Sequence, residues 1–356
     1  MRTCVSHQTA LAYLLRMPNL RDADARPSRA SAIPASVPSA AGAKALLEAL
    51  EPNLVDGADV LDVLVSTNSG RHQAKGLRAH LCTTKLPAGS FILVDAMGIE
   101  FYLCAPELVF LQMANEVELD HLIYVGFALC SSFRLDEYAP GGCALREWSD
   151  APLTSVARIR SYLERVPAGT KGRGAALRAL EHVRDGARSP YEIGLAMVIG
   201  MPLRLGGYAL GETVMNPKVK VYDGVDVRGQ VRWVTRIPDI LVSARDSNGV
   251  LRRVGVDYDA KLTHGAPDRV ARDLDRRNLL APNEDFRHIT LGTQQVNNYV
   301  AFRREMDRIR RALGQRKKPR LVGDPDSERN RRLEADTLAR QFDLWDRVLG
   351  GSRYQL

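Results

Sequence analysis

Four polar residues near the middle of the chain have the types and spacing that phosphate chemistry requires. Asp239 follows a proline, and after nineteen intervening residues the chain reads Asp-Ala-Lys at 259–261, with Asp257 just before. Buried carboxylates are unfavourable unless they are paired or bound to a metal. Mg²⁺ prefers carboxylate and water oxygens, and a lysine can neutralise charge on a reacting oxygen. We therefore predict a Mg²⁺ site, with Mn²⁺ as the alternative ion, formed by Asp239, Asp257 and Asp259 with Lys261 as an adjunct.

A β-hairpin is expected to position these residues. Two β-rich stretches, 237–244 and 250–258, flank a turn at 246–249 whose Asn-Gly pair tolerates positive φ. Side chains alternate between the faces of a strand, so Asp257, Asp259 and Lys261 are expected on one face. Asp239 lies on the partner strand, and the three carboxylates and the amine are predicted to converge at one end of the hairpin.

Two more residues are candidates for the same site. Ser189-Pro190 is typical of a helix start, which places Glu192 in the first helical turn. Glu192 there either adds a favourable charge at the helix N-terminus or binds a metal or water beside the hairpin. His264, three residues after Lys261, is a candidate general base or phosphate contact.

Basic residues after the hairpin favour an anionic partner. The segment 267–280 places arginines around an expected helix, which either pair with aspartates on a solvated face or contact phosphates. The chain has 50 Lys and Arg against 42 Asp and Glu, a formal charge of +8. We predict DNA as the partner. The residues expected to contact it are Arg236, Arg269, Arg272, Arg276 and Arg277.

The predicted order of elements is helix, three strands, helix, strand, helix. The ranges are helix 190–199, strands 218–222, 231–244 and 250–258, helix 267–280, strand 287–291 and helix 293–313. This is the order of the PD-(D/E)XK nuclease core, whose metal ion lowers the pKa of a bound water and stabilises charge on the transferred phosphorus. We expect an α/β fold in which a PD-(D/E)XK (restriction-endonuclease-like) core, a mixed sheet flanked by helices, follows a smaller α+β domain.

Five segments are predicted along the chain. They are an N-terminal helix with a flexible connector (1–42), an α+β domain (43–150), a helical linker (151–188), the nuclease-like domain (189–315), and a basic linker with a C-terminal helix (316–356). In the second segment, apolar patterns predict helices at 43–50, 107–117 and 119–132 and strands at 60–65, 77–82, 90–94 and 99–104.

Two histidines in the predicted N-terminal domain invite comparison with metal sites. His72 and His80 lie eight residues apart across an expected turn and strand. Zn²⁺ sites need at least three protein ligands, and the sequence offers no third ligand at suitable spacing. A structural or surface role is therefore favoured for both histidines.

Several protein classes do not fit the composition. The five cysteines form no C-x-x-C pair, which favours reduced thiols over a disulfide framework. The glycine-rich stretch 169–174 lacks the spacing of a phosphate-binding loop. The sequence has neither an apolar run long enough for a membrane helix nor a recognisable signal peptide, so we predict a cytoplasmic protein.

A set of short motifs covers the region from 189 to about 312. They are Ser189, Pro190 and Glu192, then Gly206-Gly207-Tyr208, Asn216, Arg236 with Asp239, Asp257-Tyr258-Asp259, His264, and Asp273 to Asn278. In these motifs the segment resembles actinobacterial proteins with a very-short-patch-repair-like endonuclease domain of the PD-(D/E)XK superfamily. Upstream, Ser6 to Leu11 and Ala105 to Leu108 are similar to the N-terminal part of those proteins, and loosely to abortive-infection (AbiEi-type) antitoxin proteins.

The resemblance implies a Mg²⁺-dependent DNA endonuclease, acting in defence or on a mobile element. Its alternative is a catalytically inactive nuclease-fold protein that binds DNA or a partner toxin. The family glutamate is Asp257 here, and the family glycine is Ala260. Two registers are therefore open: Asp257 is the motif acid with Asp259 in the lysine's place, which we favour, or Asp259 and Lys261 form the pair.

Overall fold

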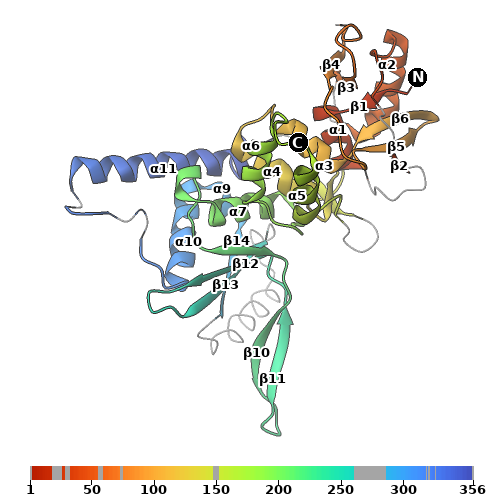
Figure 1. Cartoon of the computed structure of the whole chain (residues 1–356). Coiled ribbons are helices and arrows are strands. Elements are labelled where there is room, and N and C mark those ends of the chain that lie inside the picture. The colour runs from red at the N-terminus through yellow and green to blue at the C-terminus, as the bar shows by residue number, and fades with distance from the viewer. Residues whose placement is uncertain are drawn as a thin grey trace. The chain divides into compact units, whose positions relative to one another are not determined.

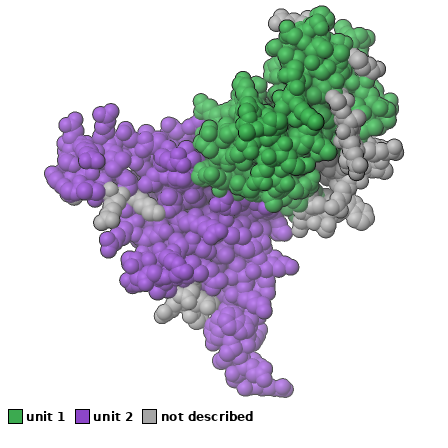
Figure 2. Space-filling view, viewed as in Figure 1, with its two compact units in different colours: residues 1–183, 356 green, residues 184–355 purple. Residues whose placement is uncertain are grey.

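The chain divides into two compact units. The computed structural model describes residues 2–17, 26–28, 33–54, 59–72, 75–146, 152–259, 286–317, 319, 321–324 and 326–354. Unit 1 comprises Met1–Val183 with Leu356, and unit 2 comprises Arg184–Gln355 (Figure 2). Each unit combines helices with β-sheet (Figure 1), which confirms the predicted α/β class. The finer division into five segments stays a prediction.

Unit 1 is built on a six-stranded mixed sheet of order β2-β5-β6-β1-β3-β4. The short strand β1 pairs parallel with β6 and antiparallel with β3, while β3 and β4 run parallel. The strands are β1 (Cys4–Val5), β2 (Arg26–Ser28), β3 (Leu61–Val65), β4 (Leu77–Leu81), β5 (Phe91–Ala96) and β6 (Ile99–Cys104). The strands expected at 60–65, 77–82, 90–94 and 99–104 are all present.

Helices and a small hairpin complete unit 1. Every residue of α3 is buried, including the polar Glu107 and Gln112, and so are the last eight residues of α4, which are apolar on all sides. The helices are α1 (His7–Arg16), α2 (Ala40–Leu50), η1 (Glu51–Asn53), α3 (Pro106–Met113), α4 (Leu119–Leu129), α5 (Val156–Arg165) and α6 (Arg173–Leu180), and the hairpin is β7 (Phe133–Leu135) with β8 (Cys143–Leu145).

Unit 2 contains a four-stranded mixed sheet of order β14-β13-β12-β9. The expected hairpin is present: β12 pairs antiparallel with β13 from Ile240↔Val256 to Arg245↔Leu251. Strand β14 then pairs parallel with β13, and β9 pairs antiparallel with β12. The strands are β9 (Glu212–Met215), β12 (Ile240–Arg245), β13 (Leu251–Asp259) and β14 (Phe286–Gly292).

The two faces of this sheet differ in chemistry. One face is apolar, and Ile240, Val256 and Leu291 on it are fully buried. Alternation along β13 puts Gly255, Asp257 and Asp259 on the opposite face. Both aspartates are therefore kept out of the apolar core.

A second hairpin corrects one expectation. Residues 231–236 were expected to lead directly into the first strand of the acidic hairpin. They form β11 (Val231–Arg236), which pairs instead with β10 (Val219–Val225). Pro238 separates β11 from β12, since proline lacks the N–H that a continuous ladder needs. The β10–β11 hairpin extends away from the four-stranded sheet as an arm (Figure 1).

The helices of unit 2 also differ in part from expectation. The helix expected at 293–313 is interrupted at Asn298, whose side chain accepts a hydrogen bond from Ala301 N and so starts a new helix. The helices are α7 (Pro190–Gly200), η2 (Leu203–Leu205), α9 (Thr293–Asn297), α10 (Tyr299–Ala312) and α11 (Glu328–Val348). None of the helices in the described ranges is long and apolar enough to cross a membrane.

The glycine pair after η2 allows α11 to pack closely. Gly206 has a φ of +83°, and a Cβ built there would lie 2.4 Å from the carbonyl oxygen of Arg340 in α11. Neither the backbone angle nor the space admits another residue without movement. Gly206 therefore fixes the approach of α11 to the end of α7 and η2.

We predict that Gly206→Ala destabilises unit 2 by about 2–4 kcal/mol, combining the cost of positive φ with overpacking. Gly249→Ala is the matched control, because Gly249 has a φ of +80° with open space around its missing Cβ. It should cost only about 1–2 kcal/mol. Urea unfolding of both variants measures the difference, and equal losses of stability would contradict the steric explanation.

Candidate functional site

Two hydrogen bonds join Asp239 to the strand that carries Asp257, one through Asp257 itself and one through Tyr258. Asp239 N donates to Asp257 Oδ1 at 3.0 Å, and Tyr258 N donates to Asp239 Oδ2 at 2.8 Å. These contacts extend the strand pairing one step beyond Ile240↔Val256, where the proline has ended the regular ladder. The two carboxylates that the sequence separates by seventeen residues therefore lie side by side on the polar face.

Glu192 lies beside this pair, in the first turn of α7. It is buried, and its carboxylate accepts hydrogen bonds from Asn216 Nδ2 at 2.8 Å, Arg188 N at 2.9 Å and Ser189 Oγ at 3.2 Å. Asn216 N also donates to Asp239 O at 2.9 Å, so one asparagine holds both acidic positions. Glu192 therefore lies in the first turn of α7 behind the Ser189 cap and close to Asp239, a position from which either of its two predicted roles would act.

His288 on β14 completes the group. Its Nε2 lies 2.8 Å from Asp257 Oδ2. Gly255 makes room for this ring, because a Cβ at Gly255 would lie 3.1 Å from His288 Cδ2. His288 was not among the residues predicted from the sequence, although a histidine within the apolar strand RHITL is a signal that could have suggested it. We call Glu192, Asp239, Asp257 and the supporting Asn216 and His288 the acidic cluster.

Burial and mutual repulsion both disfavour the charged forms of these acids. Burial and the charge of Asp239 together raise the pKa of Glu192 to about 7, against three hydrogen bonds that lower it. Burial and the charge of Asp257 likewise raise the pKa of Asp239 to about 6, while the Tyr258 N–H, His288 and Arg188 lower it. A bound cation would remove this electrostatic cost, which fits a metal-binding role.

The other predicted site residues fall in three places. Asp259 is half-buried at the end of β13, in register with Gly292, and lies on the same face as Asp257. Arg236 ends β11, and its buried Nε has no hydrogen-bond partner among the described residues. Lys261, His264, Arg269, Arg272, Arg276 and Arg277 lie outside the described residues.

Metal coordination at the acidic cluster would need water ligands. Among the described residues, the three ligand atoms that come within 4.8 Å of one another belong to His7, His80 and Glu116 in unit 1, not to the acidic cluster. Mg²⁺ is commonly bound by one or two carboxylates and several waters, so Asp239 and Asp257 suffice for it. Glu192 would then act on a metal-bound or nearby water.

Comparisons of the chain with protein-family models, curated proteins and solved structures find no significant match. The resemblance to endonuclease-domain proteins therefore stays a prediction from the motifs, and the site has to be interpreted from its own geometry.

We predict that the stability of the metal-free protein falls as the pH rises from 5 to 8. Glu192 and Asp239 bind protons more tightly in the folded than in the unfolded state, so their contribution is lost as the pH passes about 6 to 7. Asp239→Asn should reduce this fall and raise Tm at pH 8 but not at pH 5. Thermal unfolding in chelator at both pH values provides the measurement; an unchanged pH slope in Asp239→Asn would contradict the assignment.

Proposed function

We propose that unit 2 is a metal-dependent nuclease that hydrolyses phosphodiester bonds in DNA. The convergence of Asp239, Asp257 and Glu192, with raised pKa values for Glu192 and Asp239, is the observation that carries this proposal. Clusters of acids whose charged forms are disfavoured are typical of sites that bind a cation or transfer a proton. Structural ion pairing explains them less well, because Asp239 and Glu192 face another carboxylate.

The order of the described elements supports a PD-(D/E)XK core, and the helix expected at 267–280, between β13 and β14, lies outside the described residues. Helix α7 precedes the antiparallel strands β9, β12 and β13, and β14 joins parallel to β13 before α9 and α10. The arm β10–β11 is an insertion between β9 and β12 in this scheme. The acids at the end of the β12–β13 hairpin and the start of α7 are the ones that this proposal assigns to the core.

Each residue then has a chemical role. Asp239 and Asp257 would hold Mg²⁺ or Mn²⁺, which lowers the pKa of a bound water and stabilises charge at the phosphorus. Glu192 has a pKa near neutrality, which suits a general base that accepts a proton from the attacking water. His288 acts as a positioning residue, because it holds the Asp257 carboxylate from β14. Asp259 and Lys261 complete the proposed site in one of the two registers.

The arm β10–β11 supports DNA as the substrate. Lys220 and Arg228 are exposed on it, and the Trp233 ring is 62% exposed beside Tyr222. Two-stranded β-ribbons fit the major groove of DNA, and exposed aromatic rings stack on bases. The apolar inner side of the arm, Val219 and Val221, packs with Phe286, so the arm is anchored to the sheet that carries the acidic cluster.

Cleavage is predicted to require the paired aspartates. Asp239→Asn and Asp257→Asn should lower Mg²⁺- or Mn²⁺-dependent cleavage of plasmid DNA more than about 100-fold, since even the supporting partners of metal ligands are worth 10–100-fold. His288→Asn should reduce it by about 10–100-fold for that reason. Asp259→Asn tests whether Asp259 takes part in the site, since a loss equal to that of Asp257→Asn shows that cleavage needs both aspartates.

Glu212→Gln is the control for this series, because Glu212 is an exposed carboxylate at the start of β9, outside the acidic cluster. It should retain wild-type cleavage. Wild-type protein that leaves double- and single-stranded DNA intact with either metal would overturn the nuclease proposal.

A second function is a nuclease-fold protein that binds DNA without cutting it. The observation that favours it is that both oxygens of Asp257 already have internal partners, Asp239 N and His288 Nε2. In that case the cluster is a structural network, and the binding surface is the arm. The antitoxin-like role implied by the resemblance belongs to this version.

DNA binding is predicted to depend on the arm in either case. Replacing Lys220 and Arg228 together by glutamine should weaken binding and reduce the slope of log affinity against log salt by about 2. The double variant Arg331→Gln/Arg332→Gln on α11 changes the charge equally at exposed positions and should leave the slope unchanged. Fluorescence anisotropy at several salt concentrations makes the test, and identical slopes for both double variants would remove the arm from the interface.

A further inference from the structure

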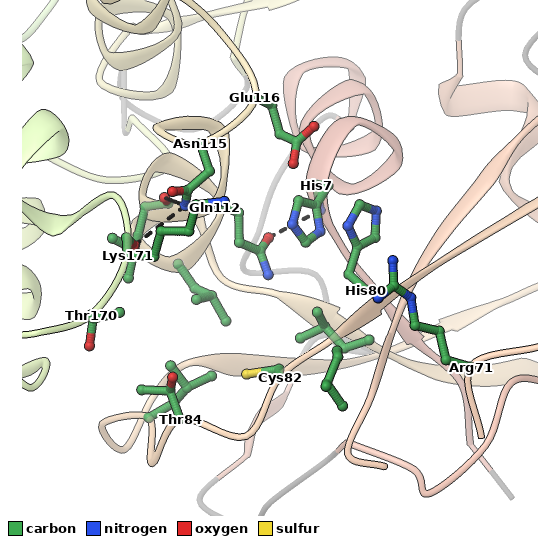
Figure 3. Close-up of a pocket in the computed structure, with 15 residues that line it drawn as sticks. His7, Arg71, His80, Cys82, Thr84, Gln112, Asn115, Glu116, Thr170 and Lys171 are labelled. Atoms are coloured by element: carbon green, nitrogen blue, oxygen red, sulfur yellow. Dashed lines mark hydrogen bonds between the residues drawn. The ribbon is translucent and has the colours of Figure 1, made fainter. Parts of the chain in front are cut away.

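Unit 1 brings together three metal-ligating side chains that are far apart in the sequence. His7 begins α1, His80 lies on β4, and Glu116 follows α3. One ligand atom from each lies within 4.8 Å of the other two. Figure 3 shows the three side chains along one side of a cavity. His80, for which the sequence offered no suitable third ligand, thus has two neighbouring ligands.

Each histidine is held through one ring nitrogen. His80 Nε2 lies 2.8 Å from Asp62 Oδ1, and His7 Nδ1 lies 2.9 Å from Ser6 Oγ. Metal-binding histidines almost always bind a carboxylate or another polar group through the nitrogen that does not face the metal. His80 Nδ1 and His7 Nε2 are the nitrogens left for a ligand, as no hydrogen bond engages either of them within the described part of the chain.

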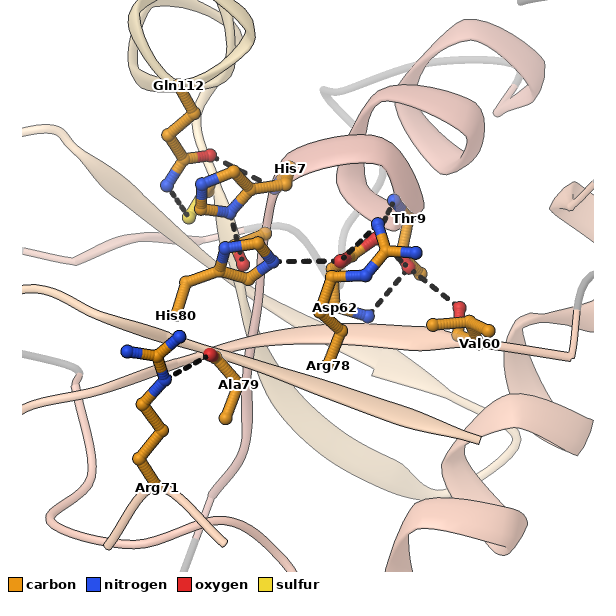
Figure 4. Close-up of polar contacts among 11 residues, drawn as sticks. His7, Thr9, Val60, Asp62, Arg71, Arg78, Ala79, His80 and Gln112 are labelled. Atoms are coloured by element: carbon orange, nitrogen blue, oxygen red, sulfur yellow. Dashed lines mark hydrogen bonds and ion pairs between the residues drawn. The ribbon is translucent and has the colours of Figure 1, made fainter. Parts of the chain in front are cut away.

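The supporting carboxylate is itself fixed. The side chain of Asp62 is 3% exposed, and its Oδ2 accepts hydrogen bonds from Thr9 N at 3.3 Å and Thr9 Oγ1 at 3.2 Å. Arg78 lies 3.5 Å from Oδ1 (Figure 4). A buried aspartate held on both oxygens can orient the His80 ring with little freedom.

The backbone at His7 has an uncommon conformation. Its φ is +47°, in the left-handed region that is uncommon for residues with a side chain, although histidine and asparagine adopt it more often than most, and its N–H donates to Gln112 Oε1 at 3.1 Å. The His7 and His80 rings lie nearly parallel, with centroids 3.5 Å apart and planes inclined by 13°. Because the lone pair of an imidazole nitrogen lies in the plane of its ring, the His7 ring has to turn out of this stack when both histidines bind one ion. Strained backbone persists where surrounding structure holds it, and it clusters at functional sites.

The site opens into a cavity of about 330 Å³. Arg71 and Lys171 contribute positive charge to its lining, and Thr170 contributes a buried hydroxyl without a hydrogen-bond partner among the described residues. A metal bound at the wall of this cavity would keep coordination positions for water or for an anionic group. This openness distinguishes it from a closed structural site with four protein ligands.

We propose that His7, His80 and Glu116 bind a Zn²⁺ ion whose remaining coordination positions face the cavity. Two imidazoles and one carboxylate select divalent transition metals rather than Mg²⁺, and this donor set is common in zinc sites with an open position. The basic lining favours an anionic ligand at the open position. This proposal is independent of the nuclease proposal, since it concerns another ion and the other unit.

The test is a Zn²⁺ titration of the untagged, chelator-stripped full chain against a chromophoric competitor, repeated in an Asp239→Asn background. We expect one Zn²⁺ per chain, and Co²⁺ in its place should give visible absorption bands. His80→Asn and His7→Asn should weaken binding by more than about 100-fold, and Asp62→Asn by about 10–100-fold. Asparagine is chosen at position 7 because it tolerates positive φ.

Two control variants establish that a loss of affinity is specific to the proposed ligands. His72→Asn removes an exposed histidine of unit 1, and Cys82→Ser removes a thiol that lines the same cavity. Both should retain wild-type affinity. Circular dichroism and Tm without metal establish that the weakened variants are folded. Absence of stoichiometric binding, or wild-type affinity in folded His7→Asn and His80→Asn, overturns the proposal.

Discussion

The paired hydrogen bonds between Asp239 and the strand carrying Asp257 are the constraint on which the acidic cluster depends. In both bonds the donor is a backbone N–H, so the backbone of the hairpin fixes the orientation of each carboxylate. Pro238 makes this possible, because it ends the regular ladder and leaves side chains to continue it. These hydrogen bonds offset part of the free-energy cost of burying two acids close together. The cost is not fully offset, because burial and the charge of Asp257 still raise the pKa of Asp239.

In both units, supporting hydrogen bonds hold the side chains of the candidate site in place, but these side chains differ between the units. In unit 2, Asn216 and His288 orient carboxylates at the end of a mixed sheet. In unit 1, Asp62 and Ser6 orient imidazoles beside another mixed sheet. In each case a small set of supporting hydrogen bonds fixes groups whose charge or lone pairs would otherwise be better solvated by water. The oxygen-rich cluster suits Mg²⁺, whereas the imidazole-rich cluster suits a transition metal.

Local structure followed from the sequence wherever the signals were short-range. The Asn-Gly turn, the Ser189-Pro190 helix start and the apolar strands of unit 1 all appear close to their expected bounds. The expectation failed at 231–236, where the register depends on pairing with β10 and on packing of Val219 and Val221 against Phe286. It failed also at Asn298, whose side chain starts a new helix inside the range 293–313 that was expected to form a single helix.

The sequence by itself determined the acidic hairpin, because strand alternation and turn chemistry act over about twenty residues and place Asp239 near Asp257. Tertiary structure alone decided the rest of both sites. His288 reaches Asp257 only through the parallel pairing of β14 with β13, and His7 meets His80 only because β1 lies between β6 and β3. Such contacts depend on the closure of long loops and on sheet order, and neither leaves a periodic signal in the residues themselves.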